Sequence, residues 1–114
     1  MQNHPEELLV FRSLVLADTG VVAKASEAKV CGGSFTNSAA TIRYLKIYNK
    51  ATAAAAADTP VLTIGIPTLQ TVTLSVPGGL RFSAGISLRC VTTAPDAGAV
   101  SATSGDVLCQ LFYK

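Results

Sequence analysis

The sequence predicts a single all-β domain, an antiparallel β-sandwich, jelly-roll-like fold or barrel of about eight short strands. Short segments rich in β-branched and aromatic residues are separated by turn signals about every 8–12 residues. No segment carries the apolar period of a convincing helix. The 114 residues suffice for one domain, which buries roughly two-thirds of the surface that its unfolded chain exposes.

The first third of the chain is expected to hold a leader and three strands. Residues 1–7 form a flexible N-terminal leader or arm in this interpretation, and residues 8–114 form the β domain. Apolar residues occupy both parities of the first expected strand, Leu8–Leu16, so we expect this strand to be buried, with a short helix as the weaker alternative. A turn at Asp18-Thr19-Gly20 follows. The expected strands are Leu8–Leu16, Val21–Ala25 and Lys29–Phe35.

The strand expected at Thr41–Asn49 is apolar on both faces, since alternate residues of a strand point to opposite sides. One face can meet the domain's own core. The other needs a second cover, which is either a further sheet or a neighbouring subunit. The large apolar side chains of this segment are therefore the candidate oligomer interface: Ile42, Tyr44, Leu45, Ile47 and Tyr48.

Alanine dominates the next segment, Ala51–Thr59. Alanine has the best helix propensity, but the segment is only about two turns long, offers no apolar stripe and runs into Pro60. Such a short isolated helix is marginal, so we expect a flexible loop, with a frayed turn as the alternative.

The remaining strands follow from period-two alternation. We expect Pro77-Gly78-Gly79 to be a turn and Thr92–Gly105 to be a long polar loop with room for a short strand at Ala99–Ala102. The strands expected here are Val61–Ile66, Thr71–Val76, Leu80–Ser83, Ile86–Val91 and Val107–Tyr113.

Charge and the cysteines narrow the classes of function. Charged residues make up 14% of the chain and the formal net charge is +2, with no basic block for nucleic acid or an anionic membrane. No apolar run spans a membrane and no signal peptide is evident, so a cytoplasm is the expected place of synthesis.

Cys90 and Cys109 share parity with apolar neighbours and are expected in the core; with Cys31 they form no disulfide or metal pattern.

A search for chemistry finds no catalytic, cofactor or metal constellation. His4 is the single histidine and lies in the leader, where nothing holds it beside a nucleophile. Glu6-Glu7 would point to different sides of an extended chain. Asp96 and Asp106 are interpreted as turn residues. The pairs Gly32-Gly33 and Gly78-Gly79 match no phosphate-binding pattern. We therefore do not expect an enzyme.

Part of the chain resembles a group of small structural proteins of tailed bacteriophages. The resemblance covers about Ser34 to Lys114 and lies in the order of four pieces: SFTNSAATIRYLKIYNKA, DTPVLTIGIP, GGLRFSAGI and GDVLCQLFYK. The alanine loop departs from the polar, Gly- and Pro-bearing loop usual in the group, and the three cysteines belong to none of its motifs.

The resemblance implies an all-β virion protein, and within that setting a capsid decoration (cement) protein on the outside of the head. Its implied partners are other copies of itself, with a trimer favoured, and the major capsid protein; the candidate interface above would then serve the oligomer or the shell. A tail-fibre or receptor-binding module is the first alternative, and a small-ligand-binding β-barrel the second. The aromatic residues lie mostly in predicted strands, which favours decoration over receptor binding.

Overall fold

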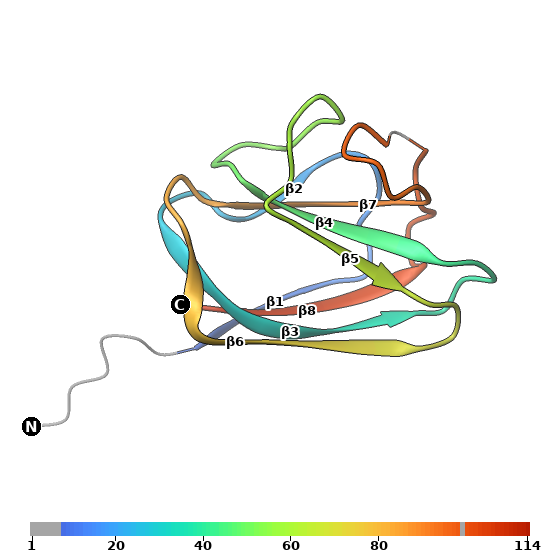
Figure 1. The fold of residues 1–114 in the computed structure, drawn as a ribbon, viewed down its shortest axis with the longest axis horizontal. Helices are drawn as coiled ribbons and strands as arrows, with labels where there is room; N and C mark the ends of the chain where they lie inside the picture. Colours follow the sequence, from blue (N-terminus) through green and yellow to red (C-terminus); the bar gives the residue numbers. More distant parts are fainter. Residues whose placement is uncertain (1–7, 99) are drawn as a thin grey trace, which may run out of the picture.

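The computed structural model describes residues 8–98 and 100–114, which form eight strands and no helix. Figure 1 shows the strands in two layers. The expectations for residues 1–7, with His4 and Glu6-Glu7, lie outside the described residues. The strands are β1 (Leu9–Ser13), β2 (Val21–Lys24), β3 (Ala28–Asn37), β4 (Arg43–Asn49), β5 (Leu62–Ile66), β6 (Thr71–Phe82), β7 (Ile86–Val91) and β8 (Val107–Tyr113).

The two layers are open four-stranded antiparallel sheets with the orders β1-β8-β3-β6 and β2-β7-β4-β5. The pairing is nested: β1 pairs with β8, β2 with β7, β3 with β6 and β4 with β5. The contacts β3–β8 and β4–β7 complete the sheets. This is the strand order of a jelly roll, in which one long hairpin folds over into a sandwich. The predicted all-β fold is confirmed, as a sandwich of the jelly-roll type.

The hydrophobic core fills the space between the two sheets. Alternate residues of β3 and β8 are buried there, as the period of a strand requires, whereas every residue of β7 is buried. The predicted core positions of Cys90 and Cys109 are confirmed, and burial raises the pKa of each thiol to about 12. The largest fully buried apolar side chains are Tyr48, Phe35, Phe82, Leu16, Leu45, Ile47, Ile66, Ile86, Leu88 and Leu111.

The turn expected at Pro77-Gly78-Gly79 is wrong, because β6 continues through it to Phe82. Val30 pairs with Leu80 and Gly32 with Ser75, so residues 76–79 bulge out opposite one residue of β3. Gly78 and Gly79 have φ of 80° and 83°, a backbone conformation that suits glycine. Pro77 is tolerated because β6 is an edge strand.

The first strand also differs from expectation, since β1 is an edge strand and not a buried one. Leu8, Leu9 and Val10 are exposed, while Leu16 becomes buried only after the chain has left the sheet. In place of the short strand at Ala99–Ala102, the described residues of that segment make a single bridge between Ser101 and Val91.

Candidate interaction surfaces

The outer face of β4 is covered by loops of the same chain. Figure 1 shows residues 50–60 and the segment after β7 lying over the outer side of the sheet β2-β7-β4-β5. Ala54 donates its backbone N–H to Ser87 Oγ at 2.9 Å, and Lys46 donates its ammonium to the carbonyl of Pro95. The second cover that the two-sided strand needs is therefore supplied within the monomer.

This arrangement corrects the predicted interface on β4. Leu45 and Ile47 are fully buried between the sheets, and Tyr48 is fully buried beneath the loops, so none of the three is available to a partner. Ile42 is exposed and Tyr44 is partly exposed. The alternation of side chains identified the two faces of β4 correctly. It does not show whether a neighbouring subunit or a loop of the same chain covers the outer face.

Arg89 is the anchor of the covering loops and was not singled out from the sequence. Its guanidinium is buried on the outer face of β7 and donates to Asp18 O at 2.6 Å, Tyr48 Oη at 3.0 Å and Gly98 O at 3.2 Å. Burial first, and then the charge of Arg89, lowers the pKa of Lys46 beside it. The signal available in the sequence was a lone charged residue in a strand whose other residues, apart from Ser87, are apolar.

Loop 51–58 is held at its base by an ion pair, and the flexibility expected for it stays a prediction. Lys50 Nζ donates to Asp58 Oδ2 at 2.7 Å, and the same oxygen accepts the N–H of Ala55 at 2.8 Å. Ala54 is buried against Gly20, where a Cβ atom on the glycine would lie 2.2 Å from the nitrogen of Ala54. The loop conformation expected in place of a helix is confirmed.

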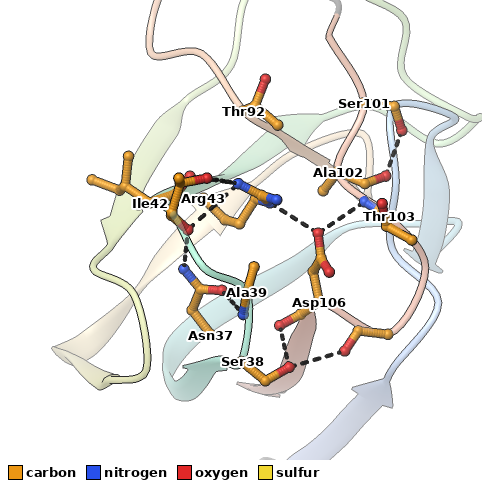
Figure 2. Close-up of polar contacts among 12 residues, drawn as sticks. Asn37, Ser38, Ala39, Ile42, Arg43, Thr92, Ser101, Ala102, Thr103 and Asp106 are labelled. Atoms are coloured by element: carbon orange, nitrogen blue, oxygen red, sulfur yellow. Dashed lines mark hydrogen bonds and ion pairs between the residues drawn. The ribbon is translucent and has the colours of Figure 1, made fainter.

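Figure 2 shows a polar cluster that joins the two sheets at one end of the sandwich. Asp106, at the start of β8, accepts hydrogen bonds from Arg43 Nε and from the N–H of Thr103, each at 2.9 Å. Asn37 Nδ2 donates to Thr41 O at 3.0 Å, and Asn37 Oδ1 accepts the N–H of Ala39 at 2.8 Å. Burial alone would raise the pKa of Asp106. The hydrogen bonds from Arg43 and from the N–H of Thr103 outweigh burial and hold this pKa below its usual value.

The described residues offer no site of conventional chemistry. Within residues 8–98 and 100–114, no group of three or more His, Cys, Asp or Glu side chains is placed to hold a metal ion, and no pocket is present. In the same part of the chain, no helix exists that could cross a membrane.

Two surfaces remain uncovered in the described structure. The outer face of the sheet β1-β8-β3-β6 carries no loop (Figure 1). Arg12, Lys29 and Arg81 have outward parity on it, and the other outward residues of β1, β3 and β6 are uncharged. On it, Thr36 and Thr71 share a hydrogen bond of 2.8 Å between their hydroxyl groups. The second surface is segment 8–15 at the edge of the same sheet, where five apolar side chains are 42–63% exposed: Leu8, Leu9, Val10, Leu14 and Val15.

The fold and its surfaces define a small jelly-roll domain. Comparison of the chain with known protein families and with characterised proteins finds no match.

Proposed function

We propose that the protein is a structural component of a bacteriophage virion, and specifically a capsid decoration (cement) protein that binds the outside of the head and stabilises it. The observation that carries the proposal is the loop-free outer face of the sheet β1-β8-β3-β6, where uncharged side chains lie beside the basic residues Arg12, Lys29 and Arg81. A face of this kind binds through area and shape, as attachment to a shell requires.

The placement of the four pieces behind the phage resemblance supports the same proposal. They cover the end of β3 with β4, then β5, then the end of β6 with the β6–β7 connection, and then β8, and two ion pairs link the first piece to the second and the fourth. Arg43 of the first piece pairs with Asp106 of the last at 2.9 Å, and Lys50 pairs with Asp58 at 2.7 Å. The resemblance thus includes residues that hold the jelly roll together, and it also includes residues of the outer face such as Thr36 and Arg81.

The proposal gives the chain a place on the capsid surface, synthesis in the host cytoplasm and no catalytic role. Its partners are the major capsid protein and other copies of the chain, with a trimer as the stoichiometry that the resemblance implies. Nucleic acid and membranes are not among the partners proposed.

Cryo-electron microscopy of the phage particle that carries this chain tests the location. Density of the jelly roll on the outside of the head supports the proposal, whereas density in the tail overturns decoration in favour of a tail module. Absence of the chain from the particle overturns a virion role altogether.

A matched pair of variants tests the face. Thr73 is exposed and lies on β6 with the outward parity of Thr71, whereas Thr63 is exposed on β5 of the other sheet. We expect T73K to weaken co-sedimentation with heads that lack the protein at least tenfold, because a lysine must be desolvated in the contact. T63K is expected to bind like the wild type. Equal binding by both variants would contradict the choice of face.

A further inference from the structure

The four edge strands of the sandwich differ in how well they are protected. The edges are β1 and β6 in one sheet and β2 and β5 in the other. The free N–H and C=O groups of an edge strand are a template for another strand, and proteins protect such edges with prolines, bulges, charges or short length. The presence or absence of these devices therefore indicates which edge is left open to a partner.

Three of the four edges in the described structure contain a bulge or have a proline within or beside the strand. β6 contains Pro77 and the bulge at residues 76–79. β2 has four residues and a register shift between Val22 and Lys24. β5 lies between Pro60 and Pro67.

The edge of β1 carries neither a proline nor a bulge, and its one protective device is the charge of Arg12. All five residues of β1 pair with β8 in an unbroken register, from Leu9 with Tyr113 to Ser13 with Cys109. Segment 8–15 contains no proline or glycine, and Arg12 is its single charge. Five of the nine large apolar side chains exposed in the described structure belong to this segment. An apolar edge of this kind favours strand pairing.

We propose that β1 is the contact between two copies of this chain. The copies pair antiparallel through β1 across a two-fold axis, which joins two four-stranded sheets into one continuous sheet of eight strands. This inference rests on the self-association in the proposed function and is independent of capsid binding. It assigns a two-fold contact where the resemblance implies a trimer.

The charge and shape of β1 identify a second copy as the occupant. Opposed residues of an antiparallel pair point to the same face, so a pairing centred on Phe11 sets Val10 opposite Arg12 of the partner copy. Arg12 then meets an apolar side chain and not its own symmetry mate, which would be destabilising. Leu9 lies opposite Ser13, and both face inward with Phe11 toward the sandwich. In this register the strand can therefore pair with its own copy with no like charges directly opposed.

The size of the contact predicts a reversible dimer. The five residues of β1 span about 17 Å at roughly 3.4 Å per residue. A single strand edge of that length buries less than the roughly 1,200 Å² at which standard stable interfaces begin. We therefore expect monomer and dimer to exchange over the micromolar concentration range.

Multi-angle light scattering of the full chain tests the proposal. From low to high micromolar concentration, we expect the wild-type mass to rise from the monomer value to twice that value. V10K should remain a monomer throughout, since it places a lysine directly opposite Arg12 of the partner copy, and like charges directly opposite each other are destabilising. V61K makes the same change at another exposed valine, outside β1, and should dimerise like the wild type. Circular dichroism and thermal melting show whether each variant is folded.

Each alternative result overturns the proposal in a distinct way. A trimer mass overturns the two-fold contact and leaves decoration standing. A V10K protein with the wild-type mass shows that the copies meet elsewhere. A wild-type mass equal to that of the monomer at every concentration overturns the proposed self-association itself. Capsid binding is tested separately by the T73K assay.

Cross-linking gives a second measurement that does not depend on V10K. A V10C/R12C double variant in a C31A background places two cysteines opposite each other at the proposed contact. Mild oxidation should yield a covalent dimer at concentrations where the wild type is dimeric. The matched T71C/T73C variant, on the opposite edge strand, should yield none. Equal cross-linking by both variants, or none by V10C/R12C in a sample of dimer mass, would overturn the pairing.

Discussion

Arg43 Nε lies 2.9 Å from Asp106 Oδ2, and this ion pair ties the start of β4 in one sheet to the start of β8 in the other. Both side chains are largely buried, at 14% and 18% exposure. The same carboxylate oxygen also accepts the N–H of Thr103, so that it closes the loop before β8 (Figure 2). One carboxylate thus sets the geometry of a sheet-to-sheet junction and of a loop.

Acid should weaken this junction. A carboxyl group whose pKa is lower in the folded than in the unfolded protein contributes stability above its unfolded pKa, about 4, and the contribution is lost as pH falls through the folded pKa. The pKa values of Asp106 and Asp58 are both lowered, that of Asp58 chiefly by the hydrogen bond from Lys50. We expect the free energy of unfolding to fall as pH drops below about 4.

Asp106→Asn tests the source of that dependence. The variant should lose about 1–3 kcal/mol of stability at neutral pH, because a partly buried guanidinium loses its charged partner. Its stability should also fall less than that of the wild type between neutral and acidic pH, as measured by urea unfolding. Asp96→Asn changes an exposed carboxylate and serves as the control. An unchanged pH profile in Asp106→Asn would contradict the assignment.

The three thiols should differ in reactivity in the native state. Cys90 and Cys109 are fully buried with a pKa of about 12, whereas Cys31 is only partly buried. Since the thiolate is the reactive species, iodoacetamide should label Cys31 alone, and all three should react in denaturant, as read by mass spectrometry. Replacing Cys90 or Cys109 with Ala should cost about 1 kcal/mol each. Fast labelling of all three in the folded protein would contradict their burial.

Leu69 should be a site where glycine stabilises the isolated protein. It is the one described non-glycine residue with a left-handed backbone, at φ 57°, and it is 76% exposed in a turn closed by the hydrogen bond from Gln70 N to Pro67 O. The left-handed conformation costs a residue with a Cβ atom roughly 1 kcal/mol. Leu69→Gly should raise the melting temperature, whereas Val61→Gly, at an ordinary φ, should lower it. A lower melting temperature in Leu69→Gly would contradict the strain.

Arg89→Met should be strongly destabilising. The substitution leaves the carbonyls of Asp18 and Gly98 and the hydroxyl of Tyr48 without their donor. A buried group left unsatisfied costs about 1–3 kcal/mol, so we expect a loss of several kcal/mol in urea unfolding and faster proteolysis after β7. Arg81→Met is the control, because Arg81 pairs with Glu27 on the exposed surface, where ion pairs contribute less than about 1 kcal/mol. Equal effects would contradict the anchoring role.

Gly20→Ala should displace loop 51–58. The added Cβ atom would lie 2.2 Å from the nitrogen and 2.4 Å from the oxygen of Ala54, and both are backbone atoms that cannot rotate away. Overpacking of this kind costs about 1–3 kcal/mol. At Gly65 the nearest atoms are side-chain carbons at 3.4 Å or more, so Gly65→Ala should be tolerated. Equal melting temperatures for the two variants would contradict the docking of the loop.

Local pattern was sufficient for several features of this protein. Period-two alternation placed β4, β5, β7 and β8 within a few residues, and parity placed Cys90 and Cys109 in the core. Proline and the lack of an apolar stripe excluded a helix from the alanine segment. These predictions hold because strand conformation and side-chain parity depend on neighbours in the chain.

Only the tertiary structure decided what covers each face. Tyr48 and Leu45 were correctly assigned to opposite faces of β4, yet the cover over Tyr48 is a set of loops held by Arg89, about forty residues away in sequence. The exposed edge of β1 likewise follows from the nested pairing order and not from its own apolar composition. The physical reason is that burial is a property of two surfaces that meet. A strand's residues determine what it can bury, and distant segments determine where it does so.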